Sequence, residues 1–187
     1  MMKGTPFIYQ GQEIGMVNNQ FTSINDFNDV SARNLSEKLK QKGQTDENIL
    51  ALLNQVSRDH SRQPMQWNKH AFAGFSEVPP WFAVNPNYTD INVEQQQQDP
   101  NSILNFYKQL IALRKSNESL VVGRYQLLMP DDPNIYAYQR IDQDMTWTII
   151  TNLSAQEGIV NIDSAQLGTL MLDHQTINNE HIRSDFI

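Results

Sequence analysis

Two arginines four residues apart, Arg58 and Arg62, are the side chains of this sequence best suited to bind a ligand. On a helical turn their guanidinium groups would share one face, and from an extended loop they could still converge. A guanidinium stays charged and offers several donors in a rigid plane, so it can bind a carboxylate and a hydroxyl at once. The same groups could instead anchor a loop by donating to backbone carbonyls, and the residues alone leave both interpretations open.

Other side chains near this pair give weaker signals. His60 lies between the arginines, and a lone histidine is more often a hydrogen-bonding scaffold residue than a catalyst. Trp67 and Trp81 could stack on the flat face of a ligand, but we expect them to anchor a local core, as tryptophans in proline-rich loops more often do. The four histidines lack metal-ligand spacing, and the sequence has no cysteine. We therefore predict no metal and no other cofactor.

The segment that carries the arginines, residues 58–100, is rich in both prolines and aromatic residues. Prolines at this density interrupt helices and strands, whereas the aromatic side chains argue against a flexible linker. A long ordered loop in a compact protein is more often functional than accidental. We therefore expect the functional site in this loop.

The chain opens with a predicted strand. Residues 6–9 form a short apolar run between glycines, which is typical of a strand enclosed on both faces. Because this leaves no room for a tail or a first helix, we expect the chain to begin inside a fold. Within residues 18–29, single apolar residues recur at every third position. This spacing indicates a short helix that packs on the surface of a larger element.

Three further helices are predicted. One covers residues 32–42, and a second runs from a cap at Thr45 or Asp46 to Ser57. The clearest covers residues 101–116, where apolar residues recur at the three-and-four spacing of one buried face. Those residues are Ile103, Phe106, Tyr107, Leu110, Ile111 and Leu113.

Beyond Gly123 the apolar residues alternate, which indicates short strands in a small antiparallel β domain. Aspartate-rich turns at 131–134 and 143–144 separate some of them. The predicted strands cover residues 125–129, 135–140, 146–152, 158–162 and 169–172.

The composition narrows the class of protein. The chain has 187 residues, of which 39% are hydrophobic, so it can bury a real core. Its 14 Lys and Arg against 21 Asp and Glu give a net charge of −7, which argues against nucleic-acid binding. The longest apolar run is too short to cross a bilayer and no secretion leader stands at the start. We expect a soluble, cytoplasmic protein without membrane contact.

Several motifs occur together in one order that resembles the C-terminal end of the α-amylase superfamily, glycoside hydrolase family 13. The strongest are Gly4-Thr-Pro-Phe-Ile-Tyr-Gln-Gly-Gln-Glu-Ile-Gly-Met16 and Ser57-Arg-Asp-His-Ser-Arg-Gln-Pro-Met-Gln-Trp67, followed by shorter ones up to Ile91-Asn92. The sequence is similar to oligo-1,6-glucosidases, dextran glucosidases and trehalose-6-phosphate hydrolases in particular. Several linked motifs in register are far more specific than any one alone.

The resemblance implies an α+β fragment of a TIM (β/α)8 barrel. Residues 6–9 would be its eighth strand, residues 11–100 the long loop after it, and residues 101–116 its eighth helix. The implied domains are 1–122, the C-terminal end of the catalytic barrel, and 123–187, an antiparallel β domain that is possibly truncated. Chemistry in such barrels is carried by the loops that follow the strands.

The resemblance also implies retaining hydrolysis of α-glucosidic bonds, which uses two carboxylates about 5 Å apart. The family takes these, and a third aspartate, from barrel strands that would precede Gly4. The motifs around Glu13, Asp26, Asp29 and Asp59 do not match the family's catalytic segments. We therefore predict no catalytic residue in this chain, and we expect Glu13 to be a buried ion-pair partner of a barrel residue.

The resemblance assigns a role to each residue of the arginine pair. Arg58 matches the family's arginine at the subsite of the non-reducing glucose, and Arg62 matches one that lines the neighbouring aglycone side. Both are predicted substrate-binding residues. Gln63 departs from the family pattern, because relatives commonly have threonine there.

We therefore expect the chain to be the C-terminal portion of an α-glucosidase about three times longer, acting on terminal bonds, α-1,6 in particular, of short oligosaccharides. The chain alone is expected to be inactive and to self-associate through exposed barrel surfaces. The alternative is a carbohydrate-binding or purely structural β module without hydrolase activity.

Overall fold

The computed structural model describes residues 1–158, 160, 168, 169, 171 and 172. By its internal contacts the chain divides into two compact units. One unit comprises residues 8–105, and the other combines residues 1–7 with 106–187. The predicted domain boundary between residues 122 and 123 stays a prediction.

Two helices of the unit 8–105 lie close to their predicted ranges, and each begins after a capping side chain. Helix α1 covers Val30–Gln41, and its cap Asp29 accepts a hydrogen bond from the Ser31 amide. Helix α2 covers Asp46–Val56, and its cap Thr45 accepts from the Asn48 amide. An oxygen-bearing side chain at this position satisfies a backbone donor that has no partner inside the helix. A third helix, α3, covers Val93–Gln98.

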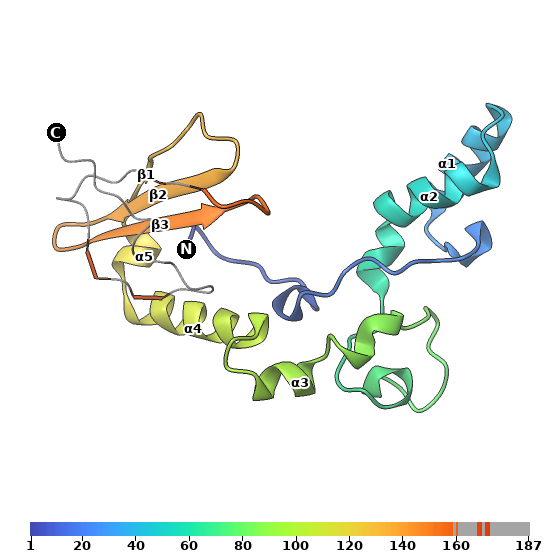
Figure 1. Cartoon of the computed structure of the whole chain (residues 1–187), viewed down its shortest axis with the longest axis horizontal. Coiled ribbons are helices and arrows are strands. Elements are labelled where there is room, and N and C mark those ends of the chain that lie inside the picture. The colour runs from blue at the N-terminus through green and yellow to red at the C-terminus, as the bar shows by residue number, and fades with distance from the viewer. Residues whose placement is uncertain (159, 161–167, 170, 173–187) are drawn as a thin grey trace. The chain divides into compact units, whose positions relative to one another are not determined.

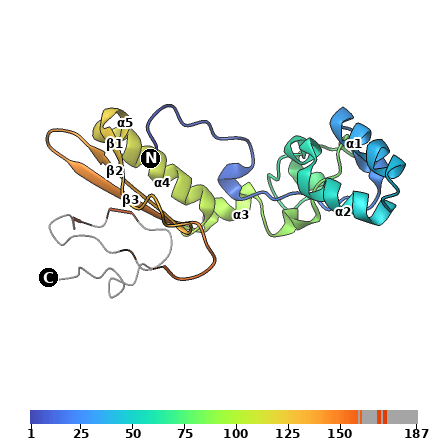
Figure 2. The same cartoon turned by 90° about the horizontal axis from the view of Figure 1, so that it is seen from above.

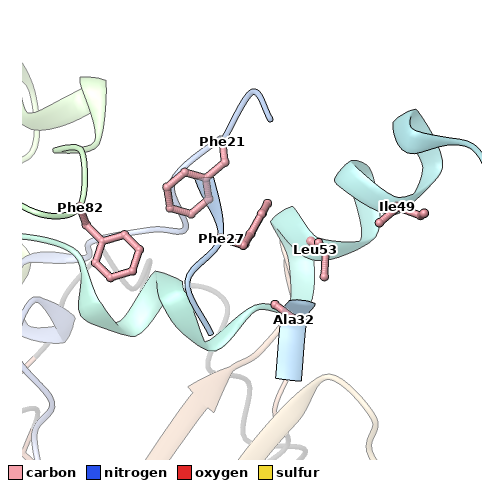
Figure 3. Packing of buried hydrophobic residues seen from close by; sticks show 6 residues of the cluster. All are labelled: Phe21, Phe27, Ala32, Ile49, Leu53 and Phe82. Atoms are coloured by element: carbon pink, nitrogen blue, oxygen red, sulfur yellow. The ribbon is translucent and has the colours of Figure 1, made fainter. Parts of the chain in front are cut away.

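The core of this unit lies where α1 and α2 meet the segment that precedes them. Phe21 and Phe27 pack edge to face, with ring centroids 4.8 Å apart. Figure 3 shows these rings beside Leu53 of α2. The short helix expected over 18–29 is reduced to the 3-10 turn Ile24–Asp26, although the aromatic side chains of that segment are buried as its pattern required. The full cluster is Phe21, Phe27, Ala32, Ile49, Leu53 and Phe82.

The proline-rich loop is folded on itself by side-chain amides. Gln66 is fully buried, and its Nε2 donates to Asn87 Oδ1 and to the Ile91 carbonyl. The expected role of the tryptophans was wrong, because Trp67 and Trp81 are 49% and 74% exposed. Phe82, beside Trp81 in sequence, fills the core position, since an apolar ring can be buried there without a partner for an indole N–H.

The second unit contains the predicted antiparallel sheet. Its strands β1 (Arg124–Leu127), β2 (Ile135–Ile141) and β3 (Thr146–Asn152) lie in the order β1-β2-β3, visible in Figures 1 and 2. Asp132 and Asp142 begin the two turns, and each accepts two backbone amides through Oδ1. These side-chain bonds replace the ladder bonds that the turn backbone cannot make. The strands expected at 158–162 and 169–172 include residues outside the described part of the chain.

Two arginines hold the first residues of the chain in this unit. Arg140 of β2 is fully buried and donates to the carbonyls of Met1, Val121 and Gly123. Arg114 donates to the carbonyls of Met2, Gly4 and Leu120. Burial lowers the pKa of the Arg140 guanidinium, and the nearby Arg114 lowers it further. The carbonyl dipoles compensate part of the cost of burying this charge.

Two segments that the sequence predicts to be buried remain at least partly exposed among the described residues. Residues 6–9 lie in neither helix nor strand, and Phe7 is 91% exposed. Helix α4 covers Ile103–Ser116 as expected, followed by the short helix α5 (Ser119–Val122), but no residue of α4 is buried. A strand needs a neighbour to pair with, and an apolar helix face needs a surface to pack on. The described residues leave the run 6–9 unpaired and cover the apolar face of α4 only in part.

We predict that Leu53→Ala destabilises the unit 8–105 by roughly 2–5 kcal/mol, because it removes a fully buried side chain and leaves a cavity. Urea unfolding followed by circular dichroism at 222 nm measures this effect. The matched control is Leu52→Ala, next to it but 36% exposed, which should cost about 0.5 kcal/mol or less. Equal losses in both variants would show that Leu53 is not a core residue.

Candidate functional site

A cavity of about 340 Å³ lies within the unit 8–105. Its walls come from two segments that are far apart in the sequence. One is the segment after the predicted strand, and the other contains the arginine motif. The lining residues are Tyr9, Gln10, Gly11, Gln12, Met16, Val17, Asn18, Ser57, His60, Ser61, Gln63 and Met65. The cavity therefore joins the two motifs that the sequence singled out.

Neutral hydrogen bonds tie the two walls together. The Tyr9 hydroxyl donates to the Ser61 carbonyl at 2.6 Å. The buried Gln63 amide donates through Nε2 to the Val17 carbonyl on one wall and to the His60 carbonyl on the other, at 3.1 and 2.9 Å. Gln63, noted above only as a departure from the family pattern, is thus a cross-link between the walls.

One wall requires a glycine. Gly11 has φ = +88°, a left-handed conformation that side chains disfavour. A Cβ at this position would also lie 2.5 Å from Met16 Sδ. The wall can therefore turn this tightly only without a side chain at Gly11.

Arg62 lies outside the cavity lining and pairs with two carboxylates. Its Nη1 donates to Asp59 Oδ1 at 2.8 Å, and its Nη2 donates to Asp29 Oδ2 at 3.0 Å. The Asp29 and Asp59 side chains are only 6% and 0% exposed, whereas the Arg62 side chain is 38% exposed. One guanidinium thus bridges the start of α1 and the 3-10 turn Arg58–Arg62.

Asp59 is the most heavily bonded group of this network. Its Oδ2 accepts from the backbone amides of Asn28 and Asp29, at 2.8 and 2.9 Å, and from the Ser57 hydroxyl. Its Oδ1 is held by Arg62. A buried carboxylate is tolerated when its lone pairs are filled in this way.

The ion pairs change the acidity of two members. Although burial of Asp29 acts in the opposite direction, its hydrogen bonds from Arg62 and from the backbone amides of Ser31 and Ala32 leave its pKa below the usual value. The hydrogen bonds to Asp29 and Asp59 raise the pKa of Arg62. Asp29 and Arg62 are therefore both charged near neutral pH, because each shift favours the ionised form.

Arg58 has a different environment from Arg62. Its side chain is exposed, does not line the cavity, and makes no hydrogen bond or ion pair within the described part of the chain. The neighbouring residues Ser57, His60 and Ser61 do line it. Arg58 is therefore next to the cavity and has its donors available.

His60 and Glu13 are placed by the scaffold. The His60 ring stacks on Phe21, with centroids 5.5 Å apart, and its Nε2 lies 3.3 Å from the Leu53 carbonyl, which fits the scaffold role expected of it. Glu13 is half-buried, and its Oε2 is buried without a hydrogen-bond partner among the described residues. Within the same described residues, no group of three or more His, Asp or Glu side chains could hold a metal ion.

Sequence reasoning considered Asp29 and Asp59 only as catalysts and missed their pairing with Arg62. One local signal was available for Asp29, because an aspartate directly before a helix is a typical cap. The contact between Arg62 and Asp29 spans 33 residues and has no local signature.

Residues 1–123 match the family described as "Alpha amylase, catalytic domain". The chain belongs to the α-amylase family. It is 41% identical over its whole length to "Probable oligo-1,6-glucosidase 2" of Bacillus subtilis strain 168 and covers 34% of that protein. It is 44% identical to a trehalose-6-phosphate hydrolase of Escherichia coli K12 over 83% of the chain, covering 28% of the relative.

Solved structures agree with this membership. The trehalose-6-phosphate hydrolase of Bacillus licheniformis matches with a TM-score of 0.82 and 40% identity, over 87% of this chain and 29% of the other. The trehalulose synthase MutB of Pseudomonas mesoacidophila MX-45 matches with a TM-score of 0.81 and 36% identity, over 87% and 30%. The chain thus spans about a third of the length of these α-amylase family members. The structures named hydrolase and synthase match it with nearly equal TM-scores.

Among the described residues, no helix has the length and apolar character needed to cross a membrane.

We predict that Asp29→Asn destabilises the unit 8–105 at pH 7 and that the difference from wild type shrinks as the pH falls below about 4. An unfolded aspartate has a pKa of about 3.9. Because the folded pKa of Asp29 is lower, its stabilising contribution is present above that value and is lost as the pH falls through the folded pKa. Asparagine keeps the helix cap, so the difference reports the charge.

Urea unfolding at pH 7, 5, 4 and 3 measures this difference. Asp46→Asn is the control, because Asp46 pairs with Lys40 at an exposed site, where the side chains are 74% and 49% exposed. A gap between Asp29→Asn and wild type that stays constant down to pH 3 would contradict the prediction.

Proposed function

We propose that this chain is the C-terminal portion of a retaining α-glucosidase that hydrolyses terminal α-glucosidic bonds of short oligosaccharides, with α-1,6 bonds as the preferred linkage. The observation that carries the proposal is the family match over residues 1–123 together with relatives named oligo-1,6-glucosidase at 41–45% identity. Because synthases share the segment, the linkage rests on these names and not on a residue of this chain.

In this proposal residues 6–9 form the last strand of a TIM barrel and α4 forms its last helix. The exposure of Phe7 and Ile111, at 91% and 37%, supports it, since both would be covered by the remaining barrel. The cavity then lies in the long loop after the last strand, where such barrels carry their chemistry. The same apolar surfaces would let the isolated chain self-associate, which sedimentation at tens of micromolar would detect.

The proposal also places the catalytic carboxylates outside these residues. Retaining hydrolysis needs one free carboxylate as nucleophile and one carboxylic acid as proton donor, about 5 Å apart. Asp29 and Asp59 are the acids nearest the arginine motif, but both are buried and hydrogen-bonded to Arg62 and to backbone amides. Because these side chains are only 6% and 0% exposed, a sugar carbon could not reach either carboxylate.

Arg58 is the proposed substrate-binding residue of this segment. Its exposed guanidinium next to the cavity can donate to sugar hydroxyls and to a carboxylate supplied by another part of the barrel. The nonreducing glucose carries several hydroxyls, which match the planar set of donors. Arg58 would thus orient this glucose against the catalytic carboxylates.

The proposed function predicts that this chain alone turns over no p-nitrophenyl α-glucoside. Joined after the upstream two-thirds of the Bacillus subtilis oligo-1,6-glucosidase 2, which supplies the remaining barrel, it should restore hydrolysis. The two proteins are compared by release of p-nitrophenol. Turnover by the highly purified chain alone, or a folded chimera that binds substrate without hydrolysing it, would count against the proposal.

In the active protein, Arg58→Ala should lower kcat/KM on small α-glucosides at least about a hundredfold, which is roughly 2.7 kcal/mol of transition-state stabilisation. Steady-state kinetics with p-nitrophenyl α-glucoside measure it. Lys40→Ala, which removes a cation from the exposed surface of α1, serves as the control and should change kcat/KM little. An effect of Arg58→Ala below threefold would assign Arg58 to the scaffold.

A further inference from the structure

We propose that Arg62 is a positioning residue: it fixes the start of α1 to the turn that carries Arg58, and it influences selectivity for the leaving sugar without contacting that sugar. This inference rests on the proposed function for its kinetic consequence, whereas its structural part concerns this chain alone. It is argued from the bonds of one guanidinium and from the burial of its two partners.

Two of the five N–H donors of Arg62 already hold carboxylates of the protein, and Arg62 does not line the cavity. Nη1 and Nη2 each hold a carboxylate, at 2.8 and 3.0 Å, and the two carboxylates belong to different elements. A sugar hydroxyl that displaced either carboxylate from Arg62 would leave Asp29 or Asp59 buried without its cation. Removing one partner of a buried pair is strongly unfavourable, so the protein contacts should persist when substrate binds.

The network fixes a particular piece of backbone. Asp59 accepts the amides of Asn28 and Asp29, and Asp29 in turn caps α1 at Ser31. The segment that leads to this point begins at Val17 and Asn18, which line the cavity. One end of the segment therefore forms the cavity wall, and Arg62 secures the other end.

The turn is secured by the same bonds. Asp59 and His60 are buried, so the turn Arg58–Arg62 is attached to the core through them and presents Arg58 outward. Loss of Arg62 would leave Arg58 beside the terminal glucose, because His60 still contacts the Leu53 carbonyl of α2. It would loosen the end of the segment at Asn28 and Asp29, and we assign the effect on the leaving sugar to that end.

Lysine cannot replace this arginine. A guanidinium is a planar fork that reaches two carboxylates at once, whereas an ammonium is a single point of charge on a flexible stem. Arg62→Lys therefore keeps the charge and removes the bridge, which makes it the sharpest variant. Asp29→Asn breaks the bridge from the other side, at a residue too buried to touch a sugar.

The first experiment is amide hydrogen exchange on the 187-residue chain. We expect the backbone amides at positions 28 and 29 to exchange at least about tenfold faster in Arg62→Lys and in Asp29→Asn, because both amides donate to Asp59, which Arg62 bridges to Asp29. The matched control is Lys40→Ala, which removes an exposed ion pair between α1 and α2 and should change these rates less than twofold.

The second experiment uses the full-length enzyme. Arg62→Lys and Asp29→Asn should both lower kcat/KM for isomaltose about tenfold, while kcat/KM for p-nitrophenyl α-glucoside stays within threefold. If Arg62 instead contacts the sugar directly, Arg62→Lys alone has this effect and Asp29→Asn resembles wild type. That result would overturn the proposal.

The two experiments test the positioning role of Arg62 and the proposed α-glucosidase function separately. Unchanged exchange at Asn28 and Asp29 in both variants would overturn the positioning role, whatever the enzyme does. Faster exchange in a full-length protein without α-glucosidase activity would uphold the bridge and remove the proposed function. Arg62→Lys and Asp29→Asn change few atoms, so the test does not depend on a variant that fails to fold.

Discussion

The carboxylate of Asp59 is the constraint on which the candidate site depends. It is fully buried, and a buried charge is stable only when its lone pairs are filled. Two backbone amides, one hydroxyl and one guanidinium fill them. Because these donors come from the start of α1 and from the turn after α2, the two regions must fold together. The aromatic core beside them supplies the apolar surface that excludes water from the same place.

Much of this fold could be predicted because its determinants are local. Caps at Asp29 and Thr45 mark the beginnings of α1 and α2, and the aspartate turns at Asp132 and Asp142 mark the sheet. Each is a side chain that satisfies backbone donors within three residues, so short sequence windows contain the whole signal. The family could be recognised for another reason, since several motifs in register cannot arise from local propensity.

Burial could not be predicted in the same way, because it depends on which distant segments of the protein pack against a residue. The apolar run 6–9 and the apolar face of α4 have sequences suited to an interior, yet they are exposed or half-exposed among the described residues. Trp81 was placed in a core that Phe82 occupies. The arginine motif shows the same limit. Its spacing left ligand binding and loop anchoring both open, and only the positions of Asp29 and Asp59 give Arg62 two partners and Arg58 none in the described chain.

Two kinds of bond hold this site, and they respond differently to their surroundings. The cavity walls are joined by neutral bonds, from Tyr9 to Ser61 and from Gln63 to Val17, which do not titrate. A threonine at position 63, as the resemblance would have it, has no atom beyond Cγ and could not reach both walls as Gln63 does. The start of α1 is instead held by charges, whose strength falls when acid protonates Asp29. Acid should therefore loosen the segment beyond the cavity before it opens the cavity itself.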